Sequence, residues 1–166
     1  MSKNQERIIL VTNDDGITAK GISALIEIAK EFGRVVVVAP DKAQSAMGHA
    51  ITINQPLRLT EAHIFEGVEA YACSGTPVDR VKLAIDKVLH RKPDLCLSGI
   101  NHGSNASINV IYSGTLSAAM EASLQRIPAI GFSLIDYHYD ADMSAAQHFG
   151  RQIIEQMLTK GVPQYH

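Results

Sequence analysis

The sequence predicts an α/β protein with a Rossmann-like, doubly wound and mostly parallel sheet. Short continuous apolar runs, typical of strands that are covered on both faces, recur along the chain. Segments between these runs place apolar residues at spacings of three and four, which is typical of helices that pack on one side. Strands that alternate with helices in this way favour parallel pairing with right-handed crossovers.

The first β-α-β unit has the clearest pattern. The apolar run from Arg7 to Thr12 predicts a buried strand, and the run from Arg34 to Ala39 predicts a second strand, closed by Pro40. The helix between them has its apolar face at Ile22, Leu25, Ala29 and Phe32. The two strands should therefore lie parallel in the sheet.

Apolar and polar residues alternate in the next part of the chain, between Ala50 and Cys73. The segments 51–54 and 57–60 both show this alternation, which suits half-exposed strands. We therefore expect a small antiparallel excursion from the sheet around residues 50–73.

Alternating helices and strands return after residue 75. The stretch Thr76-Pro77-Val78-Asp79 offers an N-cap threonine, a proline at the first helical position and an acid at the third. The elements expected beyond this helix are a strand at Leu95–Ser98, a loop from Gly99 to Asn109, a helix at Thr115–Gln125, a strand at Ala129–Leu134 and a helix at Ala141–Thr159.

Length and composition predict one globular domain over residues 1–166. Apolar residues make up 46% of the 166 residues and charged residues 19%, with a net charge of -2. This balance argues against a nucleic-acid polymer as partner, and no apolar run is long enough to cross a membrane. The polar start, Met1 to Arg7, lacks the apolar region of a signal peptide. We expect a soluble, cytoplasmic protein in which Cys73 and Cys96 are buried reduced thiols.

Polar residues gather where the predicted strands end. Ligands of open parallel α/β sheets bind outside the carboxyl ends of the strands, so these residues outline a candidate site. They are Asn13, Asp14 and Asp15 after the first strand, Asp41 and Ser45 after the second, the segment Ser74-Gly75-Thr76, Asn101, Gly103, Asn105 and Asn109 after the strand at 95–98, and Ser113-Gly114-Thr115 at a helix start.

Asp14 and Asp15 predict a metal ion. Adjacent carboxylates repel each other, and a nearby cation lets both stay ionised. Their oxygen-rich surroundings favour Mg²⁺, Mn²⁺ or Ca²⁺ over Zn²⁺. The alternative is that one aspartate caps the helix that begins near Thr18 while the other is solvated.

Ser113-Gly114-Thr115 predicts an anion site, because a helix start presents free N–H groups and the positive end of the helix dipole. The alternative is ordinary N-capping by Ser113 or Thr115. Thr76 is expected to be a cap, whereas His102 lies beside the site loop and is a candidate acid or phosphate contact. Neither a P-loop nor a Gly-x-Ser-x-Gly motif occurs in the sequence.

Taken in order, these motifs resemble the SurE family of stationary-phase survival proteins, which act as 5′/3′-nucleotidases. The resemblance runs from about Arg7 to Leu134. Its motifs are Val11-Thr12-Asn13-Asp14-Asp15-Gly16, Ala39-Pro40 with Ser45, Ser74-Gly75-Thr76-Pro77, Ser98-Gly99-Ile100-Asn101 with Gly103 and Asn105, and Tyr112-Ser113-Gly114-Thr115. It implies a Rossmann-like core and a metal-dependent phosphatase acting on nucleoside monophosphates.

The resemblance also implies roles for individual residues. The ligands of one divalent ion would be Asp14, Asp15, Ser45 and Asn101, and Asp14, Asp15 and Asn101 would take part in catalysis. Apart from the resemblance, the helix start predicts that Ser113, Gly114 and Thr115 hold the phosphate, with Asn105 and His102 as secondary candidates for orienting it.

The chain departs from the family in two respects. Its loop Ala46-Met47-Gly48-His49 differs from the small polar residues usual there, and family members are longer, with a further strand and a C-terminal arm. We therefore expect the chain to be part of a longer protein that forms a homodimer or homotetramer.

Two other functions fit parts of the pattern. A haloacid-dehalogenase-type phosphatase would use the first strand-end aspartate as a nucleophile, but that class has an Asp-x-Asp spacing and here the aspartates are adjacent. A non-catalytic nucleotide-binding or regulatory module with the same fold is the second alternative.

Overall fold

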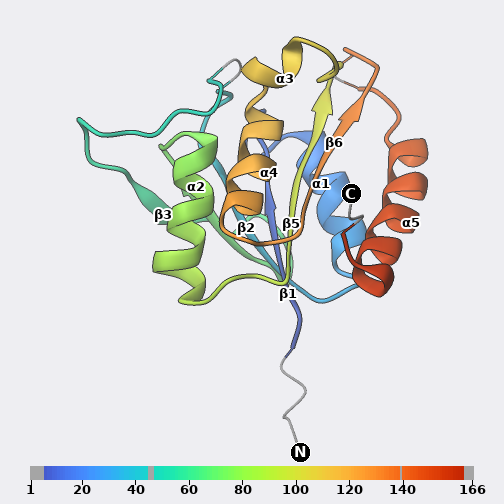
Figure 1. Ribbon diagram of the computed structural model, residues 1–166, viewed down its shortest axis with the longest axis horizontal. Coiled ribbons are helices and arrows are strands. Elements are labelled where there is room, and N and C mark those ends of the chain that lie inside the picture. Colours follow the sequence, from blue (N-terminus) through green and yellow to red (C-terminus); the bar gives the residue numbers. More distant parts are fainter. Residues whose placement is uncertain (1–5, 45–46, 139, 163–166) are drawn as a thin grey trace, which may run out of the picture.

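Six strands form one sheet in the order β3-β4-β2-β1-β5-β6, in a computed structural model that describes residues 6–44, 47–138 and 140–162 (Figure 1). The strands are β1 (Ile8–Thr12), β2 (Arg34–Pro40), β3 (Leu59–Glu61), β4 (Glu69–Cys73), β5 (Leu95–His102) and β6 (Ala129–Leu134). β3 and β4 pair antiparallel, and the other neighbouring strands pair parallel. The predicted α/β fold with a mostly parallel sheet is confirmed.

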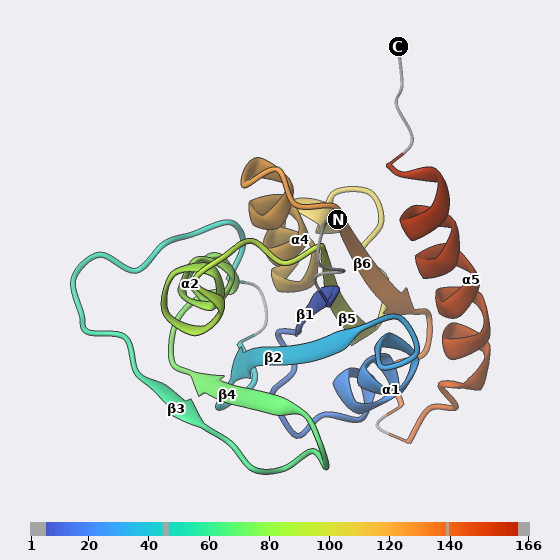
Figure 2. The same ribbon diagram turned by 90° about the horizontal axis from the view of Figure 1, so that it is seen from below.

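Helices cover both faces of the sheet, with α1 and α5 on one face and α2 and α4 on the other (Figure 2). The helical elements are α1 (Lys20–Ala29), α2 (Pro77–Leu83), a π-helical turn η1 (Ala84–Leu89), α3 (Asn109–Tyr112), α4 (Gly114–Leu124) and α5 (Ser144–Lys160). None of them, over the ranges that the structure describes, is both long and apolar enough to span a bilayer.

The two faces of the central strand β1 supply two separate cores. Ile9 and Val11 lie in the core under α1 and α5, whereas Leu10 belongs to the core under α2 and α4. This split follows from the alternation of side chains along a strand and explains why β1 reads as a continuous apolar run. Cys73 and Cys96 lie buried and unpaired in the second core, as expected.

The antiparallel excursion is smaller than the alternation at 51–54 suggested. Residues 51–58 contain no strand, and the antiparallel pair is β3 with β4. The N–H of Thr52 donates to the carboxylate of Asp79, at 3.2 Å from each oxygen. This backbone is therefore bound to the start of α2 instead of to a neighbouring strand.

The end of β5 also differs from the prediction. The strand continues through His102 instead of ending at Ser98, with a register irregularity between Ser98 and Asn101. Asn101 consequently lies on a strand end instead of in a loop. The rest of the expected loop leads into the short helix α3.

Candidate active site

Asp14 joins the end of β1 to the start of α4. Its side chain is buried, and the hydroxyl of Thr115 donates to its Oδ1 at 2.6 Å, across 101 residues of sequence. A Cβ at Gly114 would lie 2.7 Å from both the Cβ and the Oδ2 of Asp14, so glycine permits this close approach. The structure thus brings three predicted site residues into direct contact.

The loop after β2 meets the same aspartate. The N–H of Gln44 donates to the backbone carbonyl of Asp14 at 2.8 Å. The predicted ligand Ser45 follows Gln44 directly in the sequence but lies outside the described residues. The loop after β2 is therefore bound, at Gln44, to the segment that follows β1.

Asp15 is half-buried and lies beside His102, with 3.8 Å between Asp15 Oδ2 and His102 Nδ1. Burial raises the pKa of Asp15, the charge of Asp14 raises it further, and His102 opposes both effects. Oδ2 of Asp15 has no hydrogen-bond partner within the described ranges. A cation at this oxygen would replace the missing partner and relieve the repulsion between the two carboxylates.

Asn101 and Asn105 are held by their amide nitrogens. Asn101 Nδ2 donates to the carbonyl of Gly103 at 2.9 Å, and Asn105 Nδ2 donates to Ser133 Oγ at 2.8 Å. Neither amide hydrogen-bonds to Asp14 or Asp15 in the part of the chain that the structure describes. With its nitrogen occupied in this way, Asn101 has its Oδ1 available as a ligand atom, whereas Asn105 is tied to the end of β6.

The start of α4 is capped as the alternative reading proposed. Ser113 is the N-cap, and its hydroxyl accepts from the N–H of Leu116 at 3.1 Å. Its hydroxyl is thus used within the helix, and that of Thr115 is used by Asp14. An anion at this helix start would therefore meet the N–H groups of Gly114 and Thr115, because the N–H of Leu116 is already used by the cap.

Two further helix caps were predicted, Thr76 for α2 and one of the two aspartates for α1, and only the first is confirmed. Thr76 is a cap, as expected: its hydroxyl accepts from the N–H of Asp79 at 3.2 Å, within a reciprocal capping box. The interpretation of Asp14 or Asp15 as a cap of α1 is wrong. The N-cap of α1 is Ala19, without a side-chain cap, and Asp14 is buried instead of solvated.

The residues at this site fit a hard divalent ion. Within the described ranges, no three His, Cys, Asp or Glu residues are grouped so that they could hold a metal. An ion here would therefore depend on the two carboxylates together with amide and hydroxyl oxygens, which suit Mg²⁺, Mn²⁺ or Ca²⁺. The unpartnered Oδ2 of Asp15 supports this fit.

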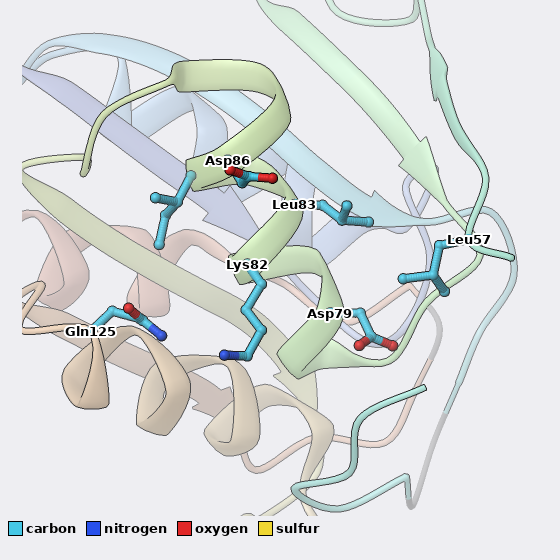
Figure 3. Close-up of a pocket in the computed structure, with 7 residues that line it drawn as sticks. Leu57, Asp79, Lys82, Leu83, Asp86 and Gln125 are labelled. Carbon is cyan, nitrogen blue, oxygen red and sulfur yellow. The ribbon is translucent and has the colours of Figure 1, made fainter. Parts of the chain in front are cut away.

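A cavity of about 320 Å³ opens beside the aspartate pair. Asp15 and His102 line it together with Lys20 and Tyr137. A larger hollow, about 410 Å³, lies on the outer side of α2 and η1, where Lys82 and Gln125 extend toward each other (Figure 3). None of the predicted site residues lines that hollow, so the cavity beside Asp15 is the better candidate for a substrate.

One buried residue beside the site escaped the sequence reasoning. Arg80 in α2 is fully buried, and its guanidinium donates to the carbonyl of Asn13 at 3.0 Å. No local pattern marks this arginine as buried, because its hydrogen-bond partners lie in three separate segments of the chain.

Comparison with known proteins places the chain in one family. The family model described as "Survival protein SurE" matches residues 9–166. A curated "5'-nucleotidase SurE" from Flavobacterium psychrophilum is 59% identical, covering 94% of this chain and 61% of that protein. A second from Bacteroides fragilis is 47% identical, covering 97% of this chain and 63% of that protein.

The fold agrees with a solved relative. The crystal structure of SurE protein from Aquifex aeolicus superposes with a TM-score of 0.84 at 39% identity, covering 94% of this chain and 62% of that chain. The chain therefore spans a little over three fifths of the length of each of these three relatives. On the family match, the identities and the fold, this chain belongs to the SurE family.

Proposed function

We propose that this chain carries the catalytic core of a divalent-metal-dependent phosphatase that hydrolyses nucleoside monophosphates to nucleoside and phosphate. The single observation that carries the proposal is the buried Asp14, which contacts the loop after β2 and the start of α4 at once. Curated SurE relatives named 5'-nucleotidase support the same activity. Cleavage of 3′-nucleotides by the same site is part of the proposal.

Each predicted residue has a role in this mechanism. Asp14, Asp15, Ser45 and Asn101 would hold the ion, which when bound would activate a water and neutralise charge on the phosphoryl group. Thr115 would keep Asp14 oriented through its hydrogen bond, and the N–H groups of Gly114 and Thr115, at the N-cap Ser113, would bind phosphate oxygens. A carboxylate of the Asp14–Asp15 pair is the proposed acceptor for the proton of the attacking water. Asn105 and His102 would orient the substrate.

The proposal extends to substrate placement and assembly. The nucleoside would occupy the cavity between Asp15, Lys20 and Tyr137. We further propose a single domain over residues 1–166, a homodimer or homotetramer, a cytoplasmic location, and neither a nucleic-acid polymer nor a membrane as partner.

The metal site is tested by Asp14→Asn and Asp15→Asn. Each change removes one carboxylate charge, so we expect phosphate release from nucleoside monophosphates to fall at least about a hundredfold, the size expected when an electrostatic contributor to catalysis is lost. Chelation with EDTA should abolish turnover, and Mn²⁺ or Mg²⁺ should restore it. The readout is phosphate release, with circular dichroism as the check on folding.

Asp86→Asn is the matched control, because Asp86 is an exposed acid on η1 whose loss should leave turnover unchanged. Full activity of both site variants at saturating metal would refute the ligand assignment. Nucleotide binding without turnover in the unaltered protein would instead indicate a non-catalytic nucleotide-binding module.

A further inference from the structure

Arg80 is a buried cation without a carboxylate in direct contact. Its side chain is fully buried, and none of the ion pairs in the described ranges includes it. Its guanidinium donates to three oxygens instead. Nη1 bonds to the carbonyl of Gly75 at 2.8 Å and to Gln44 Oε1 at 3.1 Å, and Nη2 bonds to the carbonyl of Asn13 at 3.0 Å.

Placing this charge in the interior has a cost. Burial lowers the pKa of Arg80 to about 10, and the charges of Asp14 and Asp79 oppose that shift only in part. The group therefore stays charged at neutral pH, and a buried charge destabilises a fold unless its contacts compensate. An apolar side chain at this position would pack without that cost. What arginine adds is the set of hydrogen bonds that its guanidinium makes.

Those contacts lie directly before two predicted metal ligands. Asn13 precedes Asp14, and Gln44 precedes Ser45. Gln44 also donates its N–H to the carbonyl of Asp14, so the guanidinium, the end of β1 and the loop after β2 form one connected set. The planar fork of arginine can hold several oxygens in fixed directions, which the single ammonium of lysine does not do.

We propose that Arg80 is a positioning residue, which fixes the end of β1 and the loop after β2 at Gln44 against each other so that Asp14 is placed to bind the divalent ion. It touches neither the ion nor the substrate and acts through the backbone of Asn13 and the side chain of Gln44. The inference rests on the proposed metal site and adds Arg80 as the residue that fixes the positions of the segments around it. Residues that orient metal ligands commonly change metal affinity by about 10–100-fold when they are replaced.

The test measures Mn²⁺ binding by isothermal titration calorimetry on the purified protein without substrate. Arg80→Met and Arg80→Lys should both weaken binding by about tenfold or more, because lysine keeps the charge but loses the fork. Gln44→Met should also weaken Mn²⁺ binding. Gln44→Glu should bind Mn²⁺ more tightly than Gln44→Met does, since a carboxylate can accept the same hydrogen bond from Arg80.

Ile154→Ala is the control for lost stability. Ile154 is fully buried in α5, in the core on the other face of the sheet, so this variant should unfold at a lower temperature with unchanged Mn²⁺ affinity. If Arg80→Met does not fold, the two Gln44 variants carry the test, because Gln44 is only partly buried.

The outcomes separate this inference from the proposed function. Unaltered Mn²⁺ affinity in a folded Arg80→Met, in Arg80→Lys or in Gln44→Met would overturn the positioning role while the metal site stands. An unaltered protein that binds no Mn²⁺ would overturn the metal site itself, and the positioning role with it.

Discussion

At the scale of single residues, Glu121 illustrates how this protein stabilises a buried charge. Its carboxylate on α4 is only 5% exposed and lies 3.1 Å from Lys82 Nζ of α2 and 3.3 Å from His49 Nε2. Gln125 donates a further hydrogen bond at 2.9 Å. Burial alone would raise the pKa of Glu121, but these partners outweigh it and lower that pKa.

The lowered pKa predicts how stability depends on pH. A carboxyl group whose pKa is lower in the folded state stabilises the fold above its ordinary pKa, here 4.5, and that contribution is lost as the pH falls through the folded-state pKa. Glu121→Gln should therefore lower the free energy of unfolding by about 1.5–3 kcal/mol at neutral pH, the scale of a hydrogen bond to a charged group. Urea denaturation should show that this difference shrinks once the pH drops below 4.5.

Glu27→Gln provides the comparison, because Glu27 forms an exposed pair with Lys30 and should change stability little. A Glu121→Gln deficit that stays constant across the whole pH range would show that the charge of Glu121 is not its cause.

At the scale of elements, the start of α2 is hydrogen-bonded to residues 50–52, which lie beyond the loop after β2. Thr76 Oγ1 donates to the carbonyl of Ala50 at 2.6 Å, and the Asp79 carboxylate accepts from Thr52. The capping box therefore caps the N-terminus of α2 and binds residues 50–52 at the same time. Arg80, one residue further along, fixes the preceding part of the loop through Gln44.

This double role predicts the effect of Thr76→Ala. Losing the cap should cost about 1–2 kcal/mol of stability, because both the helix N–H and the Ala50 carbonyl lose their partner. Hydrogen exchange should rise at residues 50–58 and in the first turn of α2. Thr76→Ser keeps the hydroxyl and should behave like the unaltered protein. Equal hydrogen exchange in the alanine and serine variants would show that the hydroxyl of Thr76 does not hold residues 50–58.

At the scale of the whole molecule, one edge of the sheet combines an edge strand with exposed apolar side chains. β6 ends the sheet order, so its outer edge has no strand partner in the described part of the chain. A hollow of about 500 Å³ lies between β6 and α5, and Phe149, Ile153 and Val162 are exposed. Open strand edges and exposed apolar groups favour association with another chain.

We therefore expect self-association through this side. Light scattering on the purified chain should give a mass above that of one copy, rising with concentration. Ile153→Glu should reduce it, since it places a charge among the exposed apolar groups. Gln152→Glu, at a neighbouring exposed polar position, is the matched control. A single-copy mass at every concentration would contradict association through this surface.

The sequence by itself determined those features that depend on residues close together in the chain. The β1-α1-β2 unit, the strand β6 and the capping box at Thr76 all follow from periodicity or from four consecutive residues. The edge of the sheet that carries Asp14 and Thr115 follows as well, because parallel strands connected by helices place all their carboxyl ends on one side. The hydrogen bond between these residues accordingly joins segments predicted to meet.

Only the tertiary structure decided features whose causes lie far apart in the chain. The alternation at 51–54 matches a strand pattern, yet its backbone is bound by Asp79, 27 residues away. The partners of Arg80 come from three segments, so no local pattern separates its buried guanidinium from a solvated one. Asp14 is buried because Gly114 leaves room for it beside α4. Local sequence preferences act over a few residues, whereas these hydrogen bonds form only after the sheet has brought distant segments together.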